Sequence, residues 1–164
     1  NAYQILKDKG VPEKEIYQIL LSKSRDNART PMQWNDQAYA GFSDVESWIE
    51  PIYNYKDINV EKNLEDQDSV FYYYQKLIQL RKEYEIITLG KYELIMKNDE
   101  NIYAYKRLYQ NEELYVYCNF TDKEVSYDAS ILNNEKVLIQ NYNQHQKGIL
   151  KPYESIVFYQ KSRA

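Results

Sequence analysis

Several residue types that mark common sites are scarce in this sequence of 164 residues, which has one cysteine, one histidine and four glycines. A single cysteine, Cys118, excludes an internal disulfide. We therefore expect a cytoplasmic protein, although a disulfide-free exported protein would have the same count. There is no His/Cys cluster for zinc, no calcium-loop pattern and no glycine-rich phosphate loop. The sequence predicts no metal and no cofactor.

Long apolar runs and basic blocks are also missing. The formal charge is −4, from 21 Lys and Arg against 25 Asp and Glu, and no basic stretch could follow a phosphate backbone. No run reaches membrane length, and the first residues lack the regions of a signal peptide. We expect a soluble chain without a nucleic-acid or membrane partner. Because it opens without Met inside a helix-like pattern, we also expect it to begin partway through a longer protein.

Tyrosine is abundant, with 19 copies against four Phe. A tyrosine ring supplies apolar area, but its hydroxyl needs water or a partner, so we predict a tyrosine-rich sheet that stays partly wet. Such rings could stack on sugars, yet rings that alternate along strands are more typical of a packing surface. Length and composition allow one ordinary domain, or a small domain with an appended segment.

The hydrophobic pattern changes from a helical to a strand period near Gly90. Helices are predicted at 11–23 and 67–83, the second capped by Asp66 or Asp68, with a loop-rich stretch at 24–50 between them. Antiparallel strands are predicted after Gly90, separated first by polar turns at 97–101 and 110–113. Their ranges are 92–96, 102–109, 114–120, 136–141 and 155–160. In the third, Cys118 shares a face with Leu114, Val116 and Phe120 and is predicted to be a buried filler.

The segment 25–34 is rich in the groups that hold sugars. It reads Arg-Asp-Asn-Ala-Arg-Thr-Pro-Met-Gln-Trp. Two guanidinium groups, a carboxylate, an amide and an indole together give planar donors, an acceptor and a stacking face, which suit a ring covered in hydroxyls. A loop of this length inside a compact domain is usually functional. We therefore interpret this segment as a sugar-handling loop.

A family resemblance extends from this segment through most of the chain. The run from Ser24 to Trp34 is followed by Ala40-Gly41-Phe42, Trp48-Ile49 and the stretches 54–61 and 68–82. In this order the segments resemble glycoside hydrolase family 13, and within it the group of oligo-1,6-glucosidases, dextran glucosidases and trehalose-6-phosphate hydrolases.

The resemblance implies the C-terminal part of a larger enzyme with an α+β fold. Residues 1–87 would be the end of a catalytic (β/α)8 barrel with its last helix, and residues 88–164 a C-terminal antiparallel β-sandwich. The family's three catalytic acids all lie upstream, so no catalytic residue is expected here and the isolated chain should be inactive. The intact enzyme would be a retaining α-glucosidase that hydrolyses α-1,6 bonds in short isomalto-oligosaccharides, or trehalose 6-phosphate.

The residues themselves also indicate that catalytic groups are missing. Retaining hydrolysis needs two carboxyl groups about 5 Å apart across one bond. The neighbouring acids Asp66/Asp68 and Glu112/Glu113 occur in capping or turn contexts and are predicted to be solvated surface. The single histidine, His145, is placed in a polar turn at 143–148, and a relay with Ser or Cys has no support.

The resemblance assigns roles to a few residues of the loop. Arg25 matches an arginine that binds the 4-hydroxyl of the terminal glucose in related α-glucosidases, and the fork of its guanidinium could not be replaced by Lys. Arg29 matches a second motif arginine, which could bind substrate or brace the loop. Trp34 is interpreted as a packed anchor rather than a stacking platform. Asp26 and Asn27 are predicted to hold the loop by local hydrogen bonds.

Two other hypotheses remain open at this point. A free-standing carbohydrate-binding module could use Tyr103, Tyr105, Tyr115 and Tyr117, although Tyr115 and Tyr117 share a strand face and could equally cover the adjoining helix. A scaffold or interaction domain would instead carry a broad apolar patch. The partner of the intact enzyme would be an α-glucoside sugar, and the exposed barrel-facing surface of this chain could drive self-association.

Overall fold

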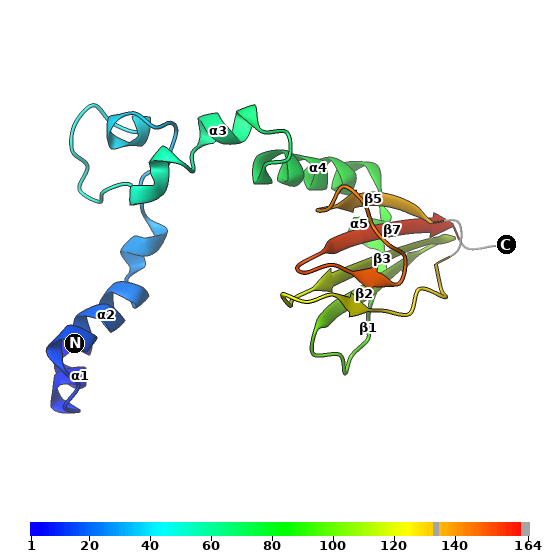
Figure 1. Ribbon diagram of the computed structural model, residues 1–164, viewed down its shortest axis with the longest axis horizontal. Coiled ribbons are helices and arrows are strands. Elements are labelled where there is room, and N and C mark those ends of the chain that lie inside the picture. The colour runs from blue at the N-terminus through cyan, green and yellow to red at the C-terminus, as the bar shows by residue number, and fades with distance from the viewer. Residues whose placement is uncertain (133–134, 162–164) are drawn as a thin grey trace. The chain divides into compact units, whose positions relative to one another are not determined.

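The computed structural model describes residues 1–132 and 135–161 (Figure 1). The chain forms two compact units, residues 1–69 and the described residues from Val70 onward. The first unit is helical and rich in loops, and the second combines helices with antiparallel sheets. The fold class is therefore α+β. No helix in the described residues is both long enough and apolar enough to cross a membrane.

The first unit opens with two short helices, α1 (Ala2–Asp8) and α2 (Glu13–Lys23). The side chain of Asn1 caps α1, and the Tyr3 hydroxyl donates to Glu13 at 2.7 Å. The prediction of a helix at 11–23 is confirmed, and Ile16 is its buried residue.

The rest of the first unit consists of single helical turns joined by irregular backbone, as the sequence predicts for 24–50. The 3₁₀ turns are η1 (Arg25–Ala28), η2 (Ala38–Gly41) and η3 (Tyr53–Lys56). The short helix α3 (Val60–Glu65) follows, and the Asn59 side chain caps it by accepting the N–H of Lys62 at 2.9 Å.

The second unit begins with α4 (Val70–Glu83) and α5 (Ile86–Leu89). Sequence analysis placed the start of the longer helix at residue 67, which is three residues too early. The Asp66 carboxylate accepts the N–H of Asp68 at 2.9 Å, and the Asp66 carbonyl accepts the N–H of Ser69 at 3.1 Å. These bonds form a turn that directs the backbone away from helical geometry until Val70.

Five strands form one antiparallel sheet in the order β1-β2-β3-β7-β5. All five were predicted, with ends that differ by one or two residues. Their bounds are β1 (Lys91–Ile95), β2 (Ile102–Tyr109), β3 (Glu112–Asn119), β5 (Lys136–Gln140) and β7 (Ser155–Lys161). The predicted turn at 110–113 is shorter, because Glu112 and Glu113 already belong to β3.

A second sheet of two short strands was missed by sequence analysis. It pairs β4 (Val125–Ser126) with β6 (Ile149–Leu150). Two residues per strand are too few for a visible alternation of apolar and polar side chains.

The large sheet separates two apolar clusters, one on each face. On one face, Leu80 of α4 and Ile86 of α5 pack with Leu114 and Val116. On the other, Tyr115 and Tyr117 pack with residues of the loops and the small sheet, including Tyr127 and Leu150. Because side chains alternate along a strand, the even residues of β3 face the helices.

This placement corrects one expectation and refines another. Tyr115 and Tyr117 do not cover the adjoining helix, since they lie on the opposite face of the sheet. They are packing residues, and the Tyr117 and Tyr127 rings lie 4.5 Å apart between centroids. Cys118 does lie on the face of Leu114 and Val116, but it is only half-buried, with its Sγ 3.4 Å from the Ser155 hydroxyl.

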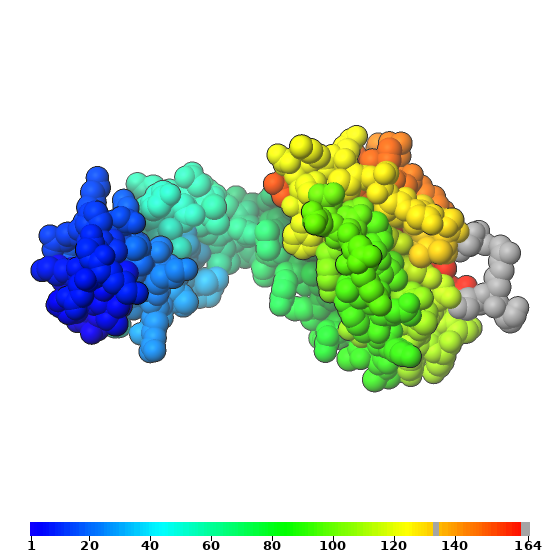
Figure 2. Space-filling model, turned by 90° about the horizontal axis from the view of Figure 1, so that it is seen from below, coloured from blue at the N-terminus to red at the C-terminus, as the bar shows by residue number. Residues whose placement is uncertain are grey.

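The division into units falls before α4, because this helix packs on the sheet. The change of hydrophobic period falls after α5, where β1 begins at Lys91. The domain boundary at 87/88 stays a prediction. In Figure 2 the bright green surface of β1 and the following loop lies at the front of the second unit.

Candidate substrate-binding loop

The arginine-rich loop begins as a direct continuation of α2. Ser24 ends the helix in extended backbone, and its hydroxyl accepts the N–H of Asp26 at 3.2 Å. The Asn27 side chain donates to the Leu21 carbonyl at 2.8 Å, and this carbonyl also accepts the N–H of Ser24 at 3.3 Å. Local hydrogen bonds therefore fix the turn η1 on α2.

Arg25, the first residue of η1, and Arg29, which follows η1, are exposed to solvent. The Arg29 guanidinium lies 3.9 Å from the Asp26 carboxylate, and both side chains are more than half exposed, so this ion pair contributes little. Arg25 makes no side-chain hydrogen bond or ion pair with the described part of the chain. The loop thus presents two guanidinium groups within one turn. Their roles toward substrate stay predictions.

The end of the loop is held by the backbone of Gln33 and Trp34. Their carbonyls accept the N–H groups of Val60 at 2.9 Å and Glu61 at 3.0 Å. The Gln33 side chain donates to the Asn54 side chain at 3.0 Å and to the Ile58 carbonyl at 2.8 Å. Sequence analysis did not single out Gln33, because a hydrogen bond from a side-chain amide to a distant residue leaves no local sequence pattern.

A left-handed stretch of backbone supports the same segment from the other side. Tyr39 and Ala40 have φ of 53° and 58°, which non-glycine residues rarely adopt. The Ala40 carbonyl accepts two N–H groups, from Trp34 at 2.8 Å and Asn35 at 3.2 Å. Gly41 follows with φ +64°, and a Cβ there would lie 2.4 Å from the Asn35 Oδ1. Strained backbone of this kind persists where its surroundings fix it, and it often lies at functional sites.

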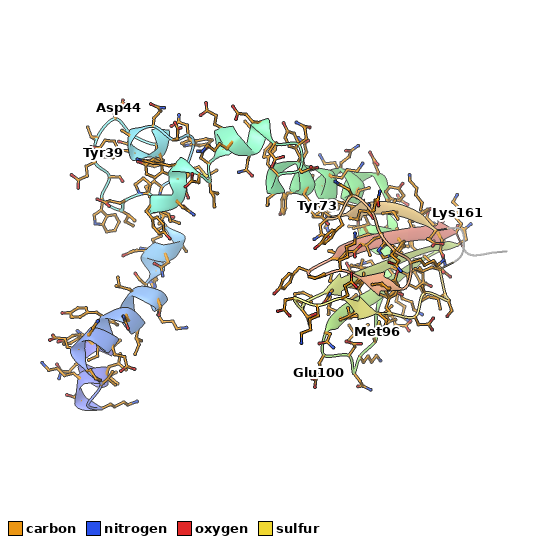
Figure 3. All side chains as sticks on the ribbon, viewed as in Figure 1. Tyr39, Asp44, Tyr73, Met96, Glu100 and Lys161 are labelled. Carbon is orange, nitrogen blue, oxygen red and sulfur yellow. The ribbon has the colours of Figure 1, made fainter. Side chains whose placement is uncertain are left out.

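Large apolar side chains around the loop are unusually exposed. Trp48 and Tyr53 are 88% and 91% exposed, and Trp34 is 50% exposed. Trp34 is thus anchored by its backbone, and its proposed role as a packed anchor stays a prediction. Tyr39 and Asp44, labelled in Figure 3, mark the shallow hollow that residues 37–44 line.

The carboxylates considered in the sequence have structural partners or face water. Asp66 closes its turn, as described above. Glu112 and Glu113 were predicted to be solvated surface, and this prediction is wrong. The Glu112 carboxylate accepts a hydrogen bond from the Tyr159 hydroxyl at 2.5 Å, and the Glu113 carboxylate accepts hydrogen bonds from the Tyr115 hydroxyl and the Gln160 side-chain amide. They also point to opposite faces of β3. Among the described residues, no group of three or more His, Cys, Asp or Glu side chains could hold a metal ion.

The predicted polar turn around His145 is present, since the Gln146 carbonyl accepts the N–H of Ile149 at 3.0 Å, but the burial of His145 was not predicted. Its side chain is buried, with Nδ1 2.8 Å from a carboxylate oxygen of Glu154 and Nε2 3.0 Å from the Tyr127 hydroxyl. Glu154 is completely buried and also accepts the N–H of Lys151 at 2.7 Å. Burial raises the pKa of Tyr127. His145, Glu154 and Tyr127 lie at the apolar cluster around Tyr117 and join the loops to β7. We therefore interpret these three side chains as structural.

The loop and the fold together define a family. Residues 1–90 match the model of the α-amylase catalytic domain, and the chain belongs to glycoside hydrolase family 13, the α-amylase family. It is 46% identical to trehalose-6-phosphate hydrolase of Bacillus subtilis over 96% of its length. It is also 41% identical to oligo-1,6-glucosidase of Halalkalibacterium halodurans over 99% of its length. The predicted family is confirmed.

Solved structures agree with these relatives. The crystal structure of trehalose-6-phosphate hydrolase from Bacillus licheniformis matches 97% of this chain with a TM-score of 0.88 and 46% identity. Isomaltulose synthase from Klebsiella sp. LX3 matches 96% with a TM-score of 0.86 and 33% identity. The chain spans 30% of the length of each of these four proteins.

Proposed function

We propose that this chain is the C-terminal part of a retaining α-glucosidase, in which the arginine-rich loop forms one wall of the glucose pocket. Residues 1–87 would be the end of the (β/α)8 barrel, and the two sheets of the second unit the C-terminal β-sandwich. The observation that carries the proposal is the loop itself, where Arg25 is exposed and its side chain makes no hydrogen bond or ion pair with the described residues. A lone, free Cys118 is compatible with the proposed cytoplasmic location.

The substrate would be a short α-glucoside. The relatives are named for oligo-1,6-glucosidase and trehalose-6-phosphate hydrolase activity, which supports an isomalto-oligosaccharide or trehalose 6-phosphate. Arg25 would donate two parallel hydrogen bonds to hydroxyls of the terminal glucose, a geometry that its planar fork allows. Arg29 would either bind substrate or brace the loop through Asp26, and Asn27 would hold the loop on α2.

The chain alone should not hydrolyse α-glucosides. Two carboxyl groups across one bond are needed, whereas Asp66 accepts a hydrogen bond within its turn and Glu112 and Glu113 accept hydrogen bonds from tyrosines. Hydrolysis of a nitrophenyl α-glucoside by the pure 164-residue chain would contradict this part of the proposal.

A chimera tests the role of the loop. This chain would replace the matching C-terminal part of the Bacillus subtilis trehalose-6-phosphate hydrolase, which restores a complete enzyme. We expect hydrolysis of trehalose 6-phosphate or a nitrophenyl α-glucoside, and Arg25→Lys should lower kcat/KM by about 10- to 100-fold, as for a lost charged hydrogen bond. Lys14→Ala, an exposed change on α2, is the control. Equal activity of Arg25→Lys and the control would refute the assigned role.

A further inference from the structure

The hollow lined by residues 37–44, which we call the 37–44 hollow, offers groups that can bind a sugar. Its volume is about 490 Å³, within the range of about 300–1,000 Å³ that is typical of small-molecule sites. Tyr39 and Phe42 line it and are 37% and 51% exposed, and Asp44 lies on the same loop (Figure 3). Aromatic faces beside hydrogen-bonding groups suit a ring covered in hydroxyls.

The backbone of the 37–44 hollow is held by residues at the end of the arginine-rich loop. The Ala40 carbonyl accepts the N–H groups of Trp34 and Asn35. The Asn35 side chain accepts the N–H of Gln37 at 3.0 Å, and it occupies the space where a Cβ at Gly41 would lie. A site that is formed before its ligand arrives loses less conformational freedom on binding. The hollow is thus preformed and attached directly to the loop.

The charge of the 37–44 hollow selects the chemistry of its ligand. The Asp44 carboxylate is exposed and makes no hydrogen bond or ion pair with the described residues. Residues 37–44 include no Lys or Arg. A carboxylate accepts hydrogen bonds from sugar hydroxyls, whereas it repels a phosphate group. The hollow therefore suits a neutral glucose unit rather than the phosphate end of trehalose 6-phosphate.

The exposed rings of the large sheet suit a sugar less well. The planes of Tyr92 and Tyr105 are tilted by 36°, and those of Tyr103 and Tyr105 by 55°. Tilted rings of this kind are in packing contact with one another, and they offer no common plane on which a sugar could stack. The hydroxyls of Tyr92 and Tyr103 are bonded to each other at 3.0 Å. The 37–44 hollow is the better candidate of the two.

We infer that the 37–44 hollow binds a glucose unit of an isomalto-oligosaccharide, beyond the terminal glucose assigned to Arg25. The inference rests on the proposed function, because it takes the Arg25 loop to hold that terminal glucose. Since Trp34 follows Arg25 by nine positions, their Cα atoms lie at most about 30 Å apart. An oligosaccharide of several units can span this distance. The inference also narrows the substrate class, because a longer neutral chain fits both places and trehalose 6-phosphate does not.

A chimera with the oligo-1,6-glucosidase of Halalkalibacterium halodurans tests the hollow in a complete enzyme. This chain would replace the matching C-terminal part of that enzyme, and kcat and KM would be measured with isomaltose and with isomaltohexaose. The preference for isomaltohexaose is the ratio of the two kcat/KM values. Asp44→Asn and Phe42→Ala should each lower this ratio about fivefold, mainly through a higher KM for isomaltohexaose.

The expected change is in KM because a glucose unit far from the reacting bond binds equally in the ground state and in the transition state. Glu15→Gln is the matched control. It also removes the charge of an exposed carboxylate in the first unit, but it lies on α2, outside the hollow, and should leave the ratio unchanged. Unchanged ratios for Asp44→Asn and Phe42→Ala in an active chimera would overturn the inference and leave the proposed function standing.

Further outcomes separate the alternatives. If the chimera is folded but inactive, saturation-transfer NMR would measure isomaltohexaose binding. Binding that is weakened by Asp44→Asn and not by Glu15→Gln would then support the hollow and count against the proposed function, and equal binding by both would overturn the inference.

Two other results would also overturn the inference. One is an equal loss of kcat/KM for trehalose 6-phosphate when Asp44→Asn is made in the Bacillus subtilis chimera described above, because the hollow would then not select a neutral chain. The other is slow oxidation of Phe42 by hydroxyl radicals in the sugar-free chimera, compared with the 164-residue chain, because protein would then cover the hollow.

Discussion

The two units of the chain are held together in different ways. In the second unit, two apolar clusters enclose the large sheet, and eight residues of β3 and β7 are buried: Leu114, Tyr115, Val116, Tyr117, Asn119, Ile156, Phe158 and Gln160. In the first unit, hydrogen bonds between loops provide the order, while Trp48, Tyr53 and Leu21 face water. A unit that buries so little apolar area gains little from folding alone. The comparison indicates that the second unit is self-sufficient and that the first is shaped for contact with something else.

The two tryptophans make this contrast measurable, because Trp34 and Trp48 are the only ones in the sequence and both lie in the first unit. Tryptophan fluorescence therefore reports the first unit, while the β-sheet signal in circular dichroism reports the second. Urea unfolding followed by both signals would separate the units.

The largest effect is expected from the buried pair of His145 and Glu154. Glu154→Ala removes the partner of His145 and of the Lys151 N–H, and it leaves polar groups unpaired in an apolar cluster. We expect a loss of about 3–5 kcal/mol in the free energy of unfolding of the second unit. The β-sheet transition should move to lower urea, while the tryptophan transition stays. A loss below about 1 kcal/mol would show that the pair is not structural.

Truncation of the core should have a nearly equal effect. Ile156 is completely buried near the start of β7, so Ile156→Ala should cost about 2–5 kcal/mol through lost contacts and a cavity. Val137→Ala on the neighbouring strand β5 is the control, since Val137 is exposed and its change should cost well under 1 kcal/mol. The same urea curves measure both. If the tryptophan transition shifted together with the β-sheet signal for Ile156→Ala, the two units would not be independent.

Alkaline pH should destabilise the second unit specifically. Burial raises the pKa of Tyr117 to about 12, above the ordinary value of about 10. The neutral phenol is thus favoured in the folded state, so stability is complete below about pH 10 and falls as pH rises through 12. Up to about 3 kcal/mol would be lost. Tyr117→Phe should flatten this slope in urea titrations between pH 9 and 12, and an unchanged slope would assign the loss to other tyrosines.

The smallest effect is expected in the first unit. Asn59 is buried, caps α3 and donates to the Tyr55 carbonyl at 2.8 Å. Asn59→Ala should cost about 1 kcal/mol. Amide hydrogen exchange would show it as faster exchange at Lys62 and at the neighbouring Val60 and Glu61. Exchange in β3 should not change, and a change there would show coupling between the units.

The sequence predicted the elements with clear periodicity and missed those that depend on distant contacts. Strands such as β3 were found because a short apolar run, residues 114–118, is bounded by polar residues. Which face meets the helices could not be read for Tyr115, because both faces of a central strand are apolar. The burial of His145 was missed because its neighbours in the sequence are polar and Glu154, its partner, is nine residues away.

The candidate loop was predicted more fully than its supports. A dense motif revealed Arg25 and Trp34, since few other functions need those groups at that spacing. The hydrogen bonds of the Gln33 side chain and the left-handed backbone at Ala40 were missed. A hydrogen bond between residues 25 positions apart and a positive φ at an alanine leave no pattern in the sequence.

The attachments of the loop have a consequence for how the enzyme can diversify. The hydrogen bonds that hold residues 24–35, as described above, end on residues 21–61. The residues that hold the loop in shape therefore lie close to it in the sequence. We expect that the segment from α2 to α3 could be exchanged between relatives as one piece. If the proposed function holds, exchange of this segment would change the wall of the sugar pocket and leave the sheet as it is.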